Sequence, residues 1–140
     1  EIDDHIDGHP YLKKDRQLLE SIPGIGRVMS RIMLAVIHGR DFTKASQVAA
    51  YIGLIPVQQE SGVFRGRTRI SKAGPARVRS KLYMAAVSSL QWNPDIKRQK
   101  ERLLSRGKTK MEAVCAAMRK LVHICFGVIK NQTEYRPQAV

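Results

Sequence analysis

The sequence predicts an all-α domain of about six helices. Apolar residues recur at intervals of three and four through most of the 140 residues, which is the period of a helix with one buried face. Glycine, proline and N-capping residues divide this pattern into separate segments. A chain of this length builds one sizeable core, so we place a single domain at residues 14–131. Residues 1–13 are then the end of a preceding helix or a linker, and residues 132–140 a loose tail.

The first ten residues are acidic, and any helix in them is expected to end near Gly8 and Pro10. His5 and His9 are four residues apart, as two ligands on one helix face would be. A solvated helix end explains them without a metal. The chain begins at Glu1 rather than at a methionine, so we expect it to be part of a longer protein.

Residues 14–38 predict two helices joined by a tight turn, the helix-hairpin-helix arrangement. The glycines of the turn Pro23-Gly24-Ile25-Gly26 leave backbone N–H groups uncovered where the second helix begins, and the helix dipole favours a phosphate there. Arg27 adds positive charge at the same point. The alternative is a tight corner in which Ile25 merely fills the core. The second helix is expected to stop at Gly39 and to turn five apolar residues mostly inward: Val28, Ile32, Leu34, Ala35 and Ile37.

Four further helices are predicted from their capping residues. The first lies within residues 41–56, is capped by Asp41 or Thr43, and ends at Gly53. The other three run from Gly74-Pro75 to about Leu90, from the cap Asn93 over residues 94–105, and from the capping box Thr109-Lys110-Met111-Glu112 to about Lys130. The last helix has a wide apolar face, which indicates the central core helix or a self-association surface. We expect His123 to lie in or near the core.

The sequence QESGVFRGRTRISKAGP, residues 59–75, interrupts the helical pattern. Its β-branched and polar residues alternate around glycines, which predicts a short β-hairpin or a glycine-rich loop insert near 59–74. Ser61 lies between Glu60 and Gly62, and no acid occurs after it in this stretch. Alternating cations and glycines suit a phosphodiester backbone. The cations of the stretch are Arg65, Arg67, Arg69 and Lys72.

The whole chain has a net charge of +13, and its positive charge is concentrated in the second half. Residues 1–60 carry 7 Lys and Arg against 8 Asp and Glu, whereas residues 61–130 carry 17 against 3. Such a one-sided excess indicates a surface that binds a polyanion. Arg77 and Arg79 continue this charge into the helix that follows the insert, while Arg119 and Lys120 either extend it or are solvated helix charges.

Most catalytic and metal sites are disfavoured by the sequence, because no Cys/His cluster, nucleotide loop or serine triad has suitable spacing. The basic half offers only Asp95, Glu101 and Glu112, too few for metal-dependent hydrolysis by this chain alone. Cys115 and Cys125 have neither metal-ligand nor disulfide spacing, which favours a reducing, cytoplasmic compartment. No apolar run reaches membrane-spanning length.

Ser61 is the remaining hydroxyl of chemical interest. A serine attacks a phosphodiester when a base takes its proton and cations stabilise the transition state. The neighbouring arginines meet the second requirement, but the side chain of adjacent Glu60 usually points elsewhere, so no base is assigned. From spacing alone, a loop serine bonded to its own backbone is the favoured interpretation.

Five separated motifs carry a further signal: LLESIPGIG, AAYIGLIPVQQESG, RGRTRISKAG, MAAVSSLQWNP and RLLSRGKTKMEAVCAAMRKLVHICFGVIKNQ. In this order they resemble the C-terminal domain of the insertion-sequence transposases that carry an N-terminal RuvC-like DEDD domain, also called bridge-RNA-guided recombinases. The resemblance extends from about Leu18 to Tyr135. Pro75 departs from the pattern, since we expect a polar residue after the glycine in many relatives. This departure alters the helix start and leaves the serine untouched.

The resemblance implies that Ser61 is a nucleophile that forms a covalent serine–DNA phosphate intermediate during strand exchange. It also implies a composite active site, in which a RuvC-like domain of the same or another protomer supplies the DEDD carboxylates and Mg²⁺. DNA, a guide non-coding RNA and further copies of the chain, as a dimer or tetramer, are the implied partners, without a membrane. The residues assigned to nucleic-acid binding are Gly24, Gly26, Arg27, Arg65, Arg67, Arg69, Lys72, Arg77 and Arg79.

Two rivals remain open at this point. One is a non-catalytic helix-hairpin-helix module that binds DNA or RNA, and the other is a structural RNA binder that uses the same basic face. Under the transposase interpretation, we expect the isolated domain to bind nucleic acid but to cleave it poorly or not at all, because its sequence has no acid cluster to hold a metal.

Overall fold

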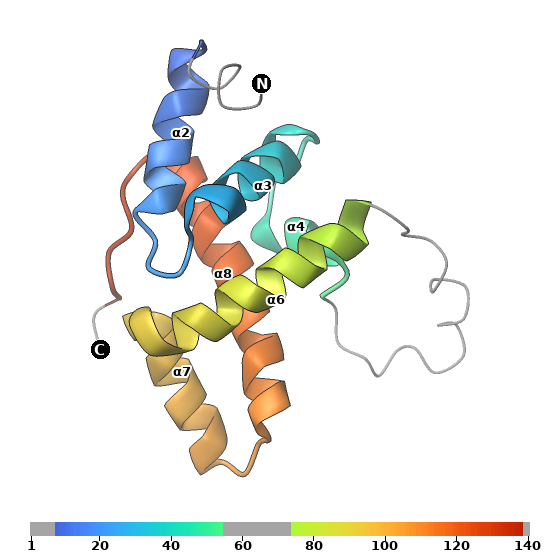
Figure 1. Ribbon diagram of the computed structural model, residues 1–140, viewed down its shortest axis with the longest axis vertical. Coiled ribbons are helices and arrows are strands. Elements are labelled where there is room, and N and C mark those ends of the chain that lie inside the picture. The colour runs from blue at the N-terminus through green and yellow to red at the C-terminus, as the bar shows by residue number, and fades with distance from the viewer. Residues whose placement is uncertain (1–7, 55–73, 139–140) are drawn as a thin grey trace.

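The computed structural model describes residues 8–54 and 74–138 (Figure 1). These two ranges contain six α-helices and no strand, which confirms the predicted fold class for the described part of the chain. The insert predicted near residues 59–74 lies outside the described residues, apart from its last residue. The helices are α2 (Pro10–Glu20), α3 (Arg27–His38), α4 (Ala45–Ile52), α6 (Gly74–Trp92), α7 (Pro94–Ser105) and α8 (Lys110–Asn131).

Helix α8 is the centre of the fold. It contacts α2, α4, α6 and α7, and Figure 1 shows α6 crossing it on the viewer's side. Cys125 on its inner face is fully buried, and burial raises the pKa of this thiol to about 12, so it remains protonated. The prediction of a central core helix is confirmed, but His123 is exposed rather than in or near the core, because it lies outside the buried stripe. That stripe consists of Ala113, Val114, Ala117, Met118, Leu121, Val122, Cys125 and Val128.

Helices α2 and α3 follow each other across a short turn and pack together, with two differences from the predicted pair. Helix α2 begins at Pro10, before the predicted start at residue 14, because proline is acceptable in a first turn, where its nitrogen needs no intrahelical partner. The helix expected before Gly8 falls on residues outside the described range. Val28 is 49% exposed and Ala35 is also exposed, so the predicted inner face of α3 is partly wrong. The helix begins at Arg27, which places a different set of residues toward the core: Met29, Ser30, Met33, Leu34 and Ile37.

The predicted caps of the later helices are correct except at the start of α4. There the N-cap position belongs to Lys44, and neither Asp41 nor Thr43 caps the helix. The Gln47 side chain instead accepts hydrogen bonds from the backbone N–H groups of Thr43 (2.7 Å) and Lys44 (3.2 Å). Gln47 thus makes the returning half of a capping box, in which a side chain one turn into the helix accepts from the N–H groups that precede it.

The starts of α7 and α8 have the side-chain caps that the sequence predicts. The Asn93 amide oxygen accepts from the backbone N–H groups of Asp95 (3.0 Å) and Ile96 (3.2 Å). At α8, the Thr109 hydroxyl accepts from the Glu112 N–H, and the Glu112 carboxylate accepts from the Thr109 N–H. This backbone hydrogen bond holds the pKa of Glu112 below its usual value. None of the helices in the described ranges is long and apolar enough to cross a membrane.

Candidate nucleic-acid interface

Gly24 of the predicted phosphate-binding turn faces helix α6. Its φ of +101° belongs to the left-handed region, and a Cβ added to it would lie 1.9 Å from the Ser89 Oγ. The preceding carbonyl of Pro23 accepts hydrogen bonds from the Asn93 amide (3.1 Å) and, at a longer 3.5 Å, from the Ser89 hydroxyl. Glycine is therefore required here for close packing between the turn and α6.

Gly26, by contrast, is exposed, and nothing lies within 4 Å of a Cβ added to it. It is the N-cap residue of α3, and no side chain caps this helix start. Arg27 follows as the first, exposed residue of α3. The structure thus separates the two glycines, because Gly24 packs against the protein and only Gly26 borders an accessible helix start. Phosphate binding at Gly26 and Arg27 stays a prediction.

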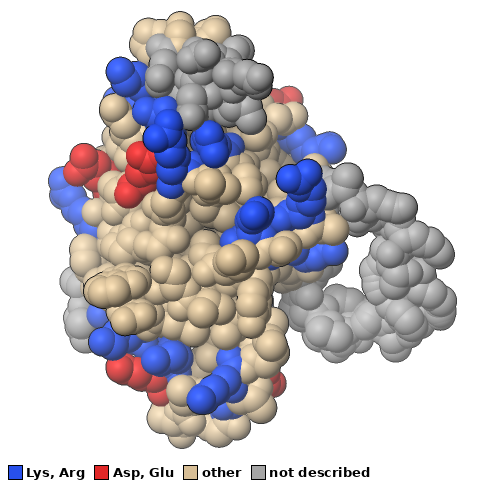
Figure 2. Space-filling view, viewed as in Figure 1, with Lys and Arg blue, Asp and Glu red and all other residues tan. Residues whose placement is uncertain are grey.

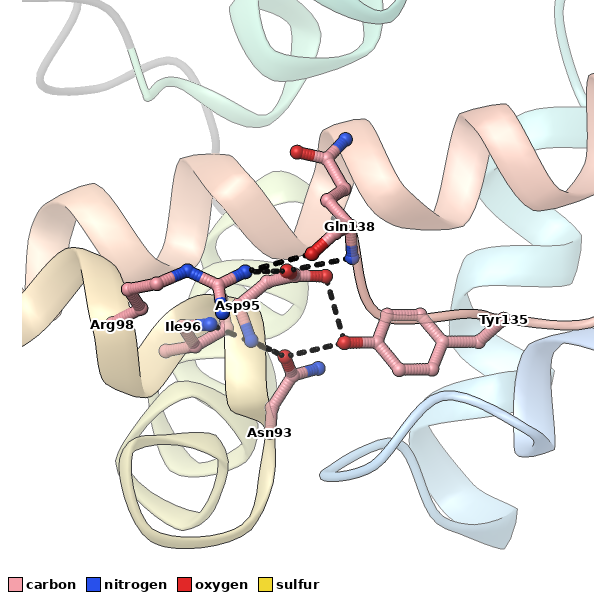
Figure 3. A network of polar contacts seen from close by, with 6 residues as sticks. All are labelled: Asn93, Asp95, Ile96, Arg98, Tyr135 and Gln138. Atoms are coloured by element: carbon pink, nitrogen blue, oxygen red, sulfur yellow. Dashed lines mark hydrogen bonds and ion pairs between the residues drawn. The ribbon is translucent and has the colours of Figure 1, made fainter. Parts of the chain in front are cut away.

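A polar network around the buried side chains of Asn93 and Asp95 joins the α6–α7 corner to the C-terminal segment (Figure 3), and Asn93 extends it to the turn. Asn93 is fully buried, and its side chain caps α7, contacts the Pro23 carbonyl, and lies 3.1 Å from the Tyr135 hydroxyl. The same hydroxyl donates to the carboxylate of Asp95 at 2.7 Å, and that carboxylate also accepts from Arg98 at 2.6 Å. These contacts fix where the turn lies relative to α6.

The described part of the C-terminal segment, residues 132–138, has no regular secondary structure but is not loose. The Tyr135 backbone N–H donates to the Ser21 Oγ (2.9 Å), beside the glycine turn, and the Gln138 N–H donates to the Asp95 carboxylate (3.1 Å). The Gln132 amide donates to the buried carboxylate of Asp15 (2.9 Å). The expectation of a loose tail is corrected for this segment, because its polar groups find partners on three distant elements.

The Tyr135 hydroxyl gives this network a measurable pH dependence. Burial, reinforced by the hydrogen bond to Asp95, raises the pKa of Tyr135 to about 12. An ordinary tyrosine has a pKa of about 10, so the contribution of this hydroxyl is complete below about pH 10 and is lost as the pH rises toward 12. We expect the stability difference between the wild type and Tyr135→Phe to shrink over this interval in urea unfolding. A stability difference that is the same at about pH 10 and about pH 12 would contradict the raised pKa of Tyr135.

The first half of α6, which follows the insert in the sequence, carries Arg77, Arg79 and Lys81. Arg77 and Lys81 are exposed, whereas Arg79 is half-buried and donates from Nη1 to the Ile52 carbonyl of α4 at 3.0 Å. No acid occurs in α6. On the face shown in Figure 2, Lys and Arg gather over the start of α6 and the neighbouring ends of α3 and α4. The remaining predicted site residues lie outside the described ranges: Ser61, Arg65, Arg67, Arg69 and Lys72.

Arg119 and Lys120 are both half-buried on α8. Lys120 lines a cavity of about 460 Å³ together with His123 and with Tyr135 and Arg136 of the C-terminal segment. The structure thus places Lys120 beside this segment.

The acids of the basic half do not form a metal site. The described residues contain no group of three or more His, Cys, Asp or Glu side chains that could hold a metal ion. Asp95 is buried and accepts hydrogen bonds from Arg98, Tyr135 and Gln138. Glu112 serves the cap of α8. The described part of the chain therefore does not fit a Mg²⁺ ion.

Sequence reasoning missed three residues that shape this surface. From the sequence, Ser89 is expected to be an ordinary helix residue, Asn93 to be a helix cap, and Tyr135 to be part of a tail. Their partners lie 40 to 70 residues away in the chain. The only local signal was the choice of asparagine before Pro94, since its amide group offers a donor that a serine or aspartate cap lacks.

Comparison with known proteins assigns the chain to a family. Residues 16–101 match the model of the transposase IS116/IS110/IS902 family. The pilin gene-inverting protein of Moraxella bovis is 33% identical over 129 residues, which cover 90% of this chain and 40% of that protein. Proteins of insertion element IS110 from Streptomyces coelicolor and insertion element IS900 from Mycobacterium paratuberculosis are 24% and 25% identical, over 93% and 86% of this chain and 31% of each relative. The chain thus spans 40% or less of the length of these relatives, and it belongs to the IS116/IS110/IS902 transposase family.

Proposed function

We propose that this chain is the domain of a DNA transposase or recombinase that binds the nucleic-acid backbone and supplies Ser61 as the nucleophile for strand cleavage and exchange. The observation that carries the proposal is the family match over residues 16–101, a range that includes Ser61 and every residue predicted to bind phosphate. Relatives named for insertion elements and for pilin gene inversion support rearrangement of DNA as the class of reaction.

In the proposed reaction, the Ser61 oxygen attacks a phosphorus atom of the DNA backbone and forms a phosphoester with it. The bond from phosphorus to one strand oxygen breaks, and the hydroxyl proton of Ser61 passes to a base outside the described residues. Arg65, Arg67 and Arg69 neutralise the charge that builds up on the phosphoryl oxygens. Strand exchange follows when a hydroxyl of another DNA strand attacks the serine phosphoester.

The site we propose is composite. Helix α6 contributes Arg77, and the start of α3 contributes Gly26 and Arg27 as backbone contacts. The DEDD carboxylates, any Mg²⁺ and the pairing with a guide RNA belong to other parts of a larger assembly of dimers or tetramers. No step assigned to this chain depends on them, because its described residues contain no group of three or more metal-ligating side chains. If the guide RNA selects the DNA sequence by base pairing, this chain needs to contact only the nucleic-acid backbone. The basic helix α6, which contains no acid, suits such contacts.

Trapping the covalent intermediate tests the proposal. The longer protein that contains this chain, incubated with its guide RNA and DNA, is expected to give a protein–DNA adduct that survives denaturation. Ser61→Ala should abolish the adduct while DNA binding persists. Ser88→Ala, which alters an exposed serine of α6, is the matched control and should form the adduct at the wild-type rate. Binding without an adduct in the wild type would favour the alternative, a non-catalytic DNA- or RNA-binding module.

A further inference from the structure

We infer that Arg79 is a positioning residue that fixes the two ends of the Ser61-bearing segment relative to each other, rather than a ligand of phosphate. This segment leaves the described structure after Leu54, which follows α4, and returns to it at Gly74, where α6 begins. The inference rests on the proposed function, because it concerns how Ser61 is held. Arg79 was assigned to the nucleic-acid interface from its charge alone, and the inference gives it a different role.

At the end of α4, the backbone hydrogen bonds of the described residues satisfy the carbonyl groups of Ala49 and Ala50 but not that of Ile52. Gly53 adopts a φ of +93°, and its N–H lies 3.0 Å from the carbonyl oxygens of Ala49 and Ala50. The N–H of Leu54 donates to the Ala49 carbonyl at 2.9 Å, which completes a Schellman-type helix end. This arrangement uses the carbonyls of Ala49 and Ala50. The carbonyl of Ile52 at the same end then needs a donor from elsewhere in the chain.

Arg79 is that donor. Its Nη1 lies 3.0 Å from the Ile52 oxygen, across 27 residues of sequence, at the end of α4 where the helix dipole favours a cation. The fit is close, since a Cβ added to Gly53 would lie 2.9 Å from this Nη1 and 3.6 Å from the Arg79 Cδ. Arg79 is half-buried here, whereas Arg77, two residues earlier on the same helix, is exposed.

This contact ties together the residues on either side of the serine-bearing segment. Ile52 lies two residues before Leu54, where the segment begins. Arg79 lies five residues after Gly74, about 8 Å along a continuous, stiff helix. The Ile52 side chain is fully buried in the core, as is Leu82 of α6, so both anchors are rigid. The contact lies between these anchors and the serine-bearing segment, so its loss lets Leu54 and the first turn of α6 shift relative to each other. Small shifts of a nucleophile cost large factors in rate.

Two variants break the contact from opposite sides. Arg79→Ala removes the donor, and Gly53→Ala places a methyl group against the guanidinium without removing any charge. Each is compared with wild type in the longer protein for two quantities: the rate of adduct formation at saturating DNA, and the slope of log affinity against log salt for a random-sequence DNA duplex. Arg77→Ala serves as the reference for loss of a phosphate contact. All are measured at a temperature where circular dichroism shows each variant folded.

We expect both variants of the contact to form the adduct at least about tenfold more slowly than wild type, with the salt slope unchanged. Arg77→Ala should flatten the slope by about one counterion. The inference is overturned if Arg79→Ala flattens the slope as Arg77→Ala does, or if Gly53→Ala forms the adduct at the wild-type rate. A wild type that binds DNA but forms no adduct instead refutes the proposed function itself, and the inference with it.

Discussion

Gly24→Ala is expected to lower the free energy of unfolding by about 2–5 kcal/mol, the largest loss from any single methyl group added to the turn. Two costs combine. The φ of +101° is strained for any residue with a Cβ, and the added methyl group would lie 1.9 Å from the Ser89 Oγ and 2.9 Å from its Cβ. Ser89 is itself fully buried, so α6 and the turn must separate to make room. Urea unfolding followed by circular dichroism measures the loss.

Gly26→Ala is the matched control, because it makes the same change two residues later in the same turn. Gly26 has an ordinary φ of −98°, and nothing lies near an added Cβ. The expected loss is below about 1 kcal/mol, the difference between glycine and alanine as helix caps. Equal losses in the two variants would show that the packing of Gly24 against α6 is wrong.

Asn93→Ala is expected to lower the free energy of unfolding by about 2–4 kcal/mol, because one side chain caps α7 and also contacts two distant segments. Its removal takes away the cap of α7 and a partner of the Tyr135 hydroxyl, and it leaves the Pro23 carbonyl with only the long contact to Ser89. Buried polar groups without partners are costly, and Asn93 is fully buried. The measurement is again urea unfolding, with the midpoint and slope both recorded.

Thr109→Ala isolates the capping part of this effect. Thr109 is exposed, and among the described residues its hydroxyl bonds only with Glu112, in the cap of α8. Its loss should cost about 1 kcal/mol. The excess for Asn93→Ala over Thr109→Ala then measures the ties to the turn and to the C-terminal segment. If the two losses are equal, Asn93 is a cap and nothing more.

The helix ends were predictable because their signals are local. Asn93 before Pro94, Thr109 before Glu112, and a glycine with positive φ at position 53 each act within one turn of a helix. Residue type and spacing therefore suffice to find them. The prediction failed at α4, where Lys44 holds the N-cap position and Gln47, inside the helix, accepts from the N–H groups of Thr43 and Lys44.

Contacts between distant segments were not predictable in the same way. The residues near Gly24 in the sequence do not indicate that Ser89 lies against it. The residues near Arg79 likewise do not indicate that it binds the Ile52 carbonyl. A positive residue beside a basic insert is therefore assigned to nucleic acid by default, although its side chain can equally serve the fold. Exposure separates Arg77 from Arg79, and exposure depends on how the helices pack.

The role of Ser61 is the central claim, and identification of the residue that carries DNA tests it most directly. The adduct formed by the longer protein with guide RNA and DNA is digested with nuclease and protease, and the modified peptide is sequenced by mass spectrometry. We predict a nucleotide phosphate on the hydroxyl of Ser61. A nucleotide on any other residue, with Ser61 unmodified, would contradict the account.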